Sequence, residues 1–286
     1  MPLSPIYQHK VLKVNESQAT SFNDSLAVES PLEIQLVWTE KGKRIRRSIS
    51  VTMRTPTLDF QLALGFLFAE GIISAYSDVL QIQYGDDAQT NDLQGNVVIV
   101  TLQPKVKVAI DKLDRHFYTT SSCGVCGKAS IELVQSHTCY YLTPNSPKIT
   151  TKLLHELPNK LRQQQTLFEN TGGIHAAALF DQQGNLMYLC EDVGRHNALD
   201  KLIGKALQEG RLPLKDCIVL VSGRASFELI QKALMAGIPI LAAVGAPSSL
   251  AVELADTYGM TLIGFLRNQQ FNVYTGAERI DLEGLE

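Results

Sequence analysis

The sequence predicts an α/β protein in two parts: a three-layer α/β/α domain with a mainly parallel sheet, and a smaller N-terminal α+β domain. From about residue 172 onward, apolar strands alternate with helices of about 10–15 residues, which indicates parallel strands joined by crossovers. Residues 31–53 instead alternate apolar and polar side chains on either side of a turn, as a hairpin does. The length of 286 residues suits about two domains.

The first part, residues 1–118, is expected to be the small α+β domain with an antiparallel sheet. Its first 25 residues are polar and aperiodic, and predict a loose arm. Thr55 can cap the helix that follows the hairpin, and Gly71 can end it. In chain order, the expected elements are a hairpin over 31–53, a helix over 55–71 and strands over 79–84 and 96–102.

Residues 128–286 are expected to form the larger domain, with its sheet covered by helices on both faces. Pro158 is expected to begin one of its helices, since proline suits a first helical turn. The expected helices are 128–136, 158–168, 195–210, 224–237 and 247–259, the hairpin is 172–192, and the further strands are 216–223, 238–245 and 260–267.

Composition excludes several classes of function. A net charge of −3 and a pI near 6.1 argue against non-specific nucleic-acid binding, which needs a basic excess. The sequence contains no apolar run of a signal peptide's kind and none of the ~18 residues that a membrane span needs. A cytoplasmic protein is therefore expected, without a nucleic-acid or membrane partner. In that reducing compartment, closely paired cysteines indicate metal binding or reactive thiols.

The stretch "TTSSCGVCGKAS" contains such a pair, Cys123 and Cys126, on a loop over 119–127 that its glycines are expected to keep mobile. A structural zinc site would need two further ligands, which His137 and Cys139 could supply. A dithiol–disulfide couple would use the low thiol pKa expected just before a helix. A sulfur carrier would hold a persulfide on the same exposed, acidified thiol. Composition alone leaves all three open.

Ligands of open parallel sheets bind beyond the carboxyl ends of the strands. Three turns of the sequence, "EDVGRHN", "SGRAS" and "GAPSS", are expected to meet there and to present free amides to an anion. Arg195 and Arg224 could make forked contacts to a pyrophosphate. Simpler interpretations remain, because Ser222 could cap a helix, Arg195 could pair with Asp192, and His175 could be a packed histidine.

Five motifs in order make the sequence resemble the formate dehydrogenase accessory protein family (FdhD/NarQ), from about residue 27 to 280. They are "SSCGVCGKAS", "TGGIHAAAL", "EDVGRHNALDK", "VSGRASFELIQKA" and "GFLRNQQFNVYTGAERI". The resemblance implies a sulfurtransferase that passes persulfide sulfur from a cysteine desulfurase to the molybdenum cofactor of formate dehydrogenase. That guanine-nucleotide-containing cofactor, bis-molybdopterin guanine dinucleotide, would be bound as cargo, with no resident metal.

The resemblance also implies roles for particular residues. Cys123 would carry the persulfide, and Cys126 would assist it or receive the sulfur. Arg267 remains as the cation of the family's cofactor-binding stretch, where this chain has Asn and Gln in place of glycine and a second basic residue. The implied cofactor-binding residues are Phe265, Leu266, Arg267, Asn268, Gln269 and Gln270, together with Arg195, His196, Ser222 and Arg224.

The family's second domain resembles the cytidine deaminase fold, which raises the question of deaminase activity. Zinc deaminases need a Glu two residues after the ligating His and a pair of cysteines at the next helix start. His196 has no such Glu, and "SGRAS" has no cysteine, so deamination is not expected. Two alternatives to sulfur transfer stay open: a non-catalytic cofactor-binding chaperone with structural zinc, and a thiol oxidoreductase. A homodimer is compatible with the sequence.

Overall fold

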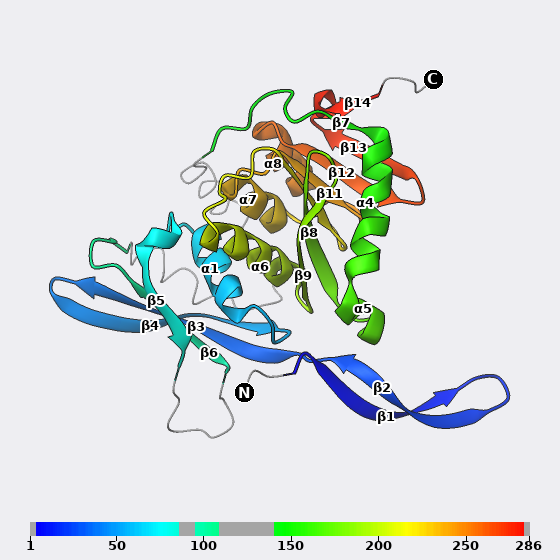
Figure 1. The fold of residues 1–286 in the computed structure, drawn as a ribbon, viewed down its shortest axis with the longest axis horizontal. Coiled ribbons are helices and arrows are strands. Elements are labelled where there is room, and N and C mark those ends of the chain that lie inside the picture. Colours follow the sequence, from blue (N-terminus) through cyan, green and yellow to red (C-terminus); the bar gives the residue numbers. More distant parts are fainter. Residues whose placement is uncertain (1–3, 86–94, 109–139, 283–286) are drawn as a thin grey trace.

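The computed structural model describes residues 4–85, 95–108 and 140–282, which form a mixed α/β fold with several sheets, as expected (Figure 1). The larger half is built on a six-stranded sheet. In their order across this sheet, the strands are β13 (Gln270–Thr275), β12 (Thr261–Arg267), β11 (Ile240–Ala243), β10 (Cys217–Val221), β8 (His175–Asp181) and β9 (Leu186–Asp192).

Within this six-stranded sheet, as far as the structure describes it, parallel pairing is confined to β10, β11 and β12. The pairs β8–β9 and β12–β13 are hairpins, and β8 also runs antiparallel to β10. The sheet is therefore mixed, with a smaller parallel share than the expected "mainly parallel" sheet. The physical reason is that short turns can join only antiparallel neighbours, whereas the parallel strands need the helical crossovers.

Helices cover both faces of this sheet, which gives the predicted three layers (Figure 1). One face packs Leu199, Leu229 and Leu254 of three helices into a large apolar cluster, and the other packs Leu157 and Leu161 of a fourth. The helices of the first face are α6 (Arg195–Gln208), α7 (Phe227–Met235) and α8 (Ser249–Thr257), and those near the second are α4 (Thr151–Gln164) and the short α5 (Thr166–Thr171).

Helix α4 begins seven residues before the expected start at Pro158, which lies inside the helix. The actual N-cap is Thr150, whose hydroxyl accepts a hydrogen bond from Leu153 N at 3.2 Å. The apolar stripe of Leu154, Leu157 and Leu161 is buried against the sheet. This packing outweighs the backbone hydrogen bond that proline removes.

The N-terminal half contains a four-stranded sheet in the order β4-β3-β6-β5, with α1 (Asp59–Ala69) on one face. Its strands are β3 (Ser30–Glu40), β4 (Lys43–Arg54), β5 (Val79–Tyr84) and β6 (Val97–Leu102). The expected hairpin is confirmed, but the sheet is not wholly antiparallel, because β6 inserts beside β3 in parallel. Parallel neighbours need a long connection, and here the chain between β3 and β6, which includes α1 and β5, supplies it.

Helix α1 starts later than expected. Leu58, at φ 53°, occupies its N-cap position without a side-chain cap, and the Thr55 hydroxyl accepts from Val193 N at 3.2 Å. The predicted end is confirmed, since Gly71 adopts a left-handed φ of 66° and its N–H donates to Phe68 O at 2.9 Å. The Thr55 side chain, which the local pattern assigned to a helix cap, therefore binds Val193 in the other half of the chain instead.

The expected loose arm is an ordered hairpin that projects from the body of the molecule (Figure 1). Strands β1 (Ile6–Val14) and β2 (Ala19–Ala27) pair antiparallel along their whole length. Most of its side chains are exposed on both faces of the hairpin, so its sequence does not alternate between apolar and polar residues as a half-buried strand does. The ladder of backbone hydrogen bonds forms this hairpin, and such bonds leave no periodic signal in a sequence.

The two halves share one hydrophobic cluster, which contains Leu64 of α1 and Leu202 of α6. The expected boundary segment, 119–127, lies outside the described residues, as does the expected helix over 128–136. Two strands, β7 (Ile149–Thr150) and β14 (Ile280–Asp281), form a small parallel pair, and η1 (Tyr76–Asp78) and η2 (Ala277–Arg279) are single 3₁₀ turns. Within the described ranges, no helix has the length and apolar character that crossing a membrane requires.

Candidate functional site

The turns that end the parallel strands stack into a continuous backbone rim. Gly245 N donates to Gly223 O at 3.1 Å, and Phe265 N donates to Gly245 O at 3.0 Å. A Cβ on Gly245 would lie 3.0 Å from Gly223 O and 3.2 Å from the Cα of Arg224. Glycine is thus needed where the turns approach this closely. The rim lies at the carboxyl edge of β10–β12, where the sequence predicted a ligand site.

His175 and Arg195 lie side by side at this rim. A Cβ on Gly223 would lie 3.2 Å from His175 Nδ1 and 3.8 Å from Arg195 Cδ. Burial lowers the pKa of His175, and the positive charge of Arg195 lowers this pKa further. His175 is therefore neutral at neutral pH, and Arg195 supplies the positive charge there.

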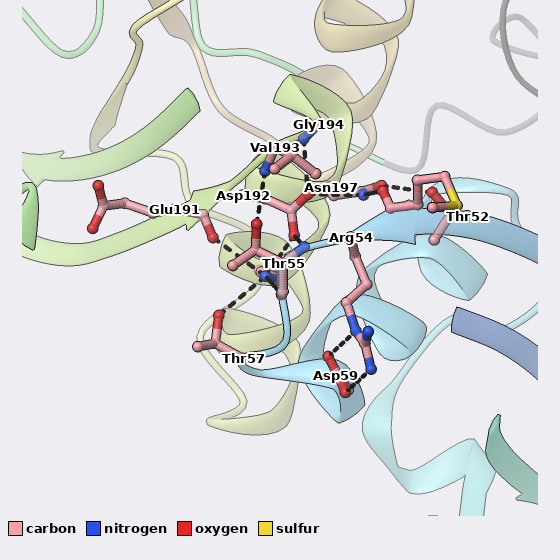
Figure 2. A network of polar contacts seen from close by, with 12 residues as sticks. Thr52, Arg54, Thr55, Thr57, Asp59, Glu191, Asp192, Val193, Gly194 and Asn197 are labelled. Atoms are coloured by element: carbon pink, nitrogen blue, oxygen red, sulfur yellow. Dashed lines mark hydrogen bonds and ion pairs between the residues drawn. The ribbon is translucent and has the colours of Figure 1, made fainter. Parts of the chain in front are cut away.

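Asp192 organises the turn that carries Arg195 (Figure 2), and its ion pair among the described residues is with Lys201, not with Arg195. Its carboxylate accepts hydrogen bonds from Gly194 N at 2.8 Å, Asn197 Nδ2 at 3.0 Å and Thr55 N at 3.2 Å. Its charge partner is Lys201 Nζ at 2.6 Å, and both side chains are fully buried. The predicted alternative of an Asp192–Arg195 pair is therefore wrong.

The same lysine connects the two halves of the chain. Lys201 Nζ also donates to Thr55 O at 2.9 Å, Thr57 Oγ1 at 3.1 Å and Glu191 O at 3.2 Å. Thr55 and Thr57 belong to the segment between β4 and α1, so this segment is fastened beneath the Arg195 turn (Figure 2). The N-terminal half thereby orients the rim of the other half.

Arg195 itself is left with an unused donor. Its buried Nε has no hydrogen-bond partner among the described residues. A buried N–H without an acceptor costs about 1–3 kcal/mol, and such groups in native proteins call for an explanation. An anion held at the rim would supply the acceptor.

A cavity of about 700 Å³ opens beside His175 and Ser222. Gln165, between α4 and α5, lines it and is 5% exposed, and its Nε2 has no partner among the residues that the structure describes. Arg162 stacks its guanidinium over the Phe168 ring at 4.1 Å, and both line the same cavity. The remaining lining residues are Gly172, Gly173, Ile174, Val193 and Val244.

Sequence reasoning missed Arg162, Gln165 and Phe168. The stretch "RQQQTLF" gives no motif, and the break between α4 and α5 has no glycine or internal proline to mark it. Glu191 secures the break, because its carboxylate accepts from Leu167 N at 3.0 Å and Phe168 N at 2.9 Å. This long-range contact helps to hold α5 at the cavity.

Ser222 lines this cavity with its hydroxyl already engaged, whereas His196 lies outside it. The Ser222 hydroxyl accepts from Ala176 N at 2.9 Å, which ties β10 to β8, so it is not a helix cap. His196 Nε2 lies 3.1 Å from Ser226 Oγ and 3.7 Å from Glu228 Oε2. It lines a separate cavity of about 350 Å³ between the two halves. Burial lowers the pKa of His196 to about 4, with further lowering by Arg195.

The stretch from Phe265 to Gln270 ends β12 and turns into β13. Phe265 has a left-handed φ of 54° at a bulge in β12, and the centre of the Arg267 guanidinium lies 5.8 Å from its ring centroid. Leu266 is buried in the core, so its side chain is not available to a ligand. Asn268 and Gln269 form the exposed two-residue turn, and Gln270 pairs with Arg267.

Arg224 and Arg267 are both exposed at this end of the sheet. Among the described residues, no hydrogen bond or ion pair joins the 267–270 turn to Arg195 or Arg224. The strained backbone at Phe265 costs about 1–3 kcal/mol for a bulky residue, and such strain concentrates at ligand sites. The structure thus brings together Arg195, His175 and the glycine turns, and leaves the 267–270 turn as an exposed neighbour.

The predicted carrier cysteines, Cys123 and Cys126, lie outside the described residues, as do His137 and Cys139 of the zinc alternative. In the described part of the chain, no group of three or more His, Cys, Asp or Glu side chains could hold a metal ion. Cys190 and Cys217 are buried free thiols, and burial raises their pKa to about 12 and about 11. These two are therefore inert at neutral pH.

Comparisons with known proteins bear on this site. The sequence model of the FdhD/NarQ family matches residues 27–281. The sulfur carrier protein FdhD of Streptomyces coelicolor is 49% identical over 96% of this chain and 95% of its own length. The protein of the same name from Sulfurisphaera tokodaii is 42% identical over 95% of this chain and 97% of its own length.

One solved structure shows the same fold. It is the crystal structure of a candidate formate dehydrogenase accessory protein from Desulfotalea psychrophila, with a TM-score of 0.71 and 23% identity. The similarity covers 96% of this chain and 99% of that one.

Proposed function

The chain belongs to the FdhD/NarQ family, and from that membership we propose that it is a sulfur carrier. It takes persulfide sulfur from a cysteine desulfurase and passes it to the molybdenum cofactor that formate dehydrogenase requires. The cofactor, bis-molybdopterin guanine dinucleotide, is cargo held at the backbone rim of β10–β12. The observation that carries the cofactor part of the proposal is a pair of buried donors without acceptors, Arg195 Nε and Gln165 Nε2.

The covalent step is assigned to Cys123 from the sequence. Its thiolate attacks the terminal sulfur of the donor's persulfide, and the donor's S–S bond breaks as its own cysteine leaves as a thiolate. The terminal sulfur is then bonded to Cys123 as a new persulfide, and Cys126 assists its onward passage. We place this transfer in the cytoplasm, whose reducing poise keeps an exposed carrier thiol from being lost to a disulfide.

The rim offers chemistry that suits the phosphate and guanine parts of the cargo. Phosphate oxygens accept from the Arg195 guanidinium, with Arg224 and Arg267 as exposed cations nearby, whereas the amides of Gly194 and Gly245 already donate to Asp192 and to Gly223 O. The Phe265 ring offers a face on which guanine can stack. A cavity of about 700 Å³ suits one nucleotide-sized portion of the ligand. In this proposal Leu266 contributes packing alone, and Ser222 holds the rim together.

Mass spectrometry of the intact protein tests the carrier role. After incubation with cysteine desulfurase and cysteine, the wild-type chain should gain about 32 Da, the mass of one sulfur, on a thiol. Cys123→Ala should lose this adduct, while Cys190→Ala should keep it, because Cys190 is buried. A wild-type chain that gains no sulfur, or a tightly bound zinc that is lost with Cys123→Ala, would overturn the proposal.

Binding of GDP, a fragment of the cargo, tests the rim separately. Arg195→Met should weaken GDP binding by about tenfold, since a charge-assisted hydrogen bond contributes about 1.5–3 kcal/mol. Arg211→Met is the matched control, because Arg211 is exposed just beyond the other end of α6. Equal affinities of the two variants, measured by isothermal titration calorimetry, would exclude Arg195 from the site.

A further inference from the structure

The β3–β4 hairpin extends beyond the sheet to which it belongs. Strand β3 pairs with β6 only from Glu33 to Val37, whereas the β3–β4 ladder continues to the pair Glu40–Lys43 (Figure 1). The last residues of the hairpin therefore project as a two-stranded ribbon. Trp38, 3% exposed and opposite Ile45, fixes the root of this ribbon in the core. This ribbon, together with the two residues that follow it on β4 at the edge of the sheet, is called the β3–β4 extension here (residues 39–47).

The β3–β4 extension is strongly basic in a chain of net charge −3. Glu40 is its one carboxylate, against the five cations Lys41, Lys43, Arg44, Arg46 and Arg47. Four of these cations, all except Arg47, are exposed.

The charges of Lys41, Lys43 and Arg44 are not neutralised by any of the described residues. Neither Lys41, Lys43 nor Arg44 forms an ion pair with any described residue. Arg46 Nε donates to the neutral amide oxygen of Gln35 at 2.6 Å, which orients the guanidinium without cancelling its charge. The extension thus presents uncompensated positive charge on a rigid support.

The position of the extension relates it to the proposed carrier cysteines. Strand β6 runs parallel to β3, and Thr101 lies opposite Val37. The chain therefore leaves β6 at the same end of the sheet from which the extension projects. It then continues through Val108 into residues 109–139, which contain Cys123. A protein bound to the extension would lie at the end of the sheet where β6 ends, before the part of the sequence that contains Cys123.

We propose that the β3–β4 extension docks the sulfur-donor protein through an acidic patch on that protein. This inference rests on the proposed function, because only a sulfur carrier needs a donor. A carrier must meet its donor quickly and leave again, and complementary surface charge raises association rates without requiring a large interface. A duplex or single-stranded nucleic acid is a poorer fit, since the chain is acidic overall and the ribbon's large aromatic residue, Trp38, is buried.

Charge reversal tests the docking. The variant carries Lys41→Glu, Lys43→Glu and Arg44→Glu, and the control carries Lys10→Glu, Lys13→Glu and Lys152→Glu, which are equally exposed and change net charge equally. Association with the cysteine desulfurase of the same cell is followed by stopped-flow fluorescence at several salt concentrations. The variant should associate about tenfold more slowly at low salt, with a difference that shrinks as salt rises, and the control should stay near wild type.

Two further readings separate the possible failures. If wild-type chain gains sulfur from the desulfurase while the variant associates as fast as wild type, the docking inference fails and the proposed function stands. If wild-type chain gains no sulfur, both fail. An equal slowing of association in the variant and the control would also overturn the inference. So would a variant that associates normally with the desulfurase but no longer binds single-stranded DNA or vesicles containing phosphatidylserine.

Discussion

Gly65 of α1 and Gly204 of α6 lie backbone against backbone where the two halves of the chain cross. A Cβ on Gly204 would lie 1.8 Å from Gln61 O and 2.8 Å from Gly65 N, and a Cβ on Gly65 would lie 1.9 Å from Asp200 O. No side chain fits at either position, because real Cβ atoms do not approach backbone atoms so closely. This crossing sets the N-terminal half against the helix that begins at the rim.

Gly204→Ala is expected to lower the free energy of unfolding by about 3 kcal/mol, since the two helices must separate to admit the methyl group. Urea denaturation followed by circular dichroism measures this. Gly173→Ala is the control, because its Cβ would meet its nearest atom at 3.8 Å and should cost under about 1 kcal/mol. Similar midpoints for the two variants would contradict the close crossing.

Lys201→Met is expected to destabilise the fold by about 3–5 kcal/mol, because it leaves the Asp192 carboxylate buried without its charge partner. The double variant with Asp192→Asn should recover part of this loss, since no buried charge remains unpaired. Lys160→Met serves as the comparison, because the Lys160 side chain is 37% exposed and its surface ion pair contributes under about 1 kcal/mol. Thermal denaturation at neutral pH compares Lys201→Met, the double variant and Lys160→Met. If Lys201→Met loses no more stability than Lys160→Met, the expectation is wrong.

His196 is expected to titrate near pH 4, and NMR of the histidine ring protons can follow it, with His196→Gln identifying the resonance. The unfolded chain would take up this proton near pH 6.5, well before the folded chain does. Stability that His196 contributes above pH 6.5 is therefore lost as the pH falls toward 4. The decrease in the urea midpoint from pH 7 to pH 5 should be smaller in His196→Gln than in wild type. A ring titrating at or above pH 6.5 would refute the burial effect.

Phe265→Gly is expected to weaken GDP binding while costing little stability. Glycine adopts the φ of 54° without strain, whereas the stacking face of the ring is lost. Phe265→Ala loses the ring but keeps the strained backbone, so it should bind GDP as weakly and unfold more easily. Calorimetric titration and thermal melts of both variants separate the two effects. Unchanged GDP affinity in both would exclude Phe265 as a stacking platform.

Much of this architecture was accessible from local patterns. The helices that begin at Arg195, Phe227 and Ser249 follow apolar strands, and their order alone placed three turns at one edge of a sheet. Arg195 was found in this way, because its turn is contiguous in sequence and the crossover rule determines where the turn lies. The family was likewise recognisable from short motifs.

Other features depend on contacts that cross the chain. Thr55 and Pro158 were misassigned because each obeys a local preference that packing overrides, against Val193 in one case and through the buried leucines of α4 in the other. Phe168 is held at the cavity by a contact across the chain, because Glu191, more than twenty residues away, accepts from the amides of Leu167 and Phe168. The β1–β2 arm is held by backbone hydrogen bonds, which are independent of side-chain identity.

From residue order alone follow the class of fold, the edge of the sheet at which we propose a ligand site, and the family, since all three depend on short-range periodicity and contiguous motifs. Three-dimensional packing was needed to show that Asp192 is neutralised by Lys201, so that Arg195 keeps an unused donor. The reason is physical: the cost of a buried charge depends on which distant group shares its low-dielectric surroundings, and that choice is made only when the chain folds.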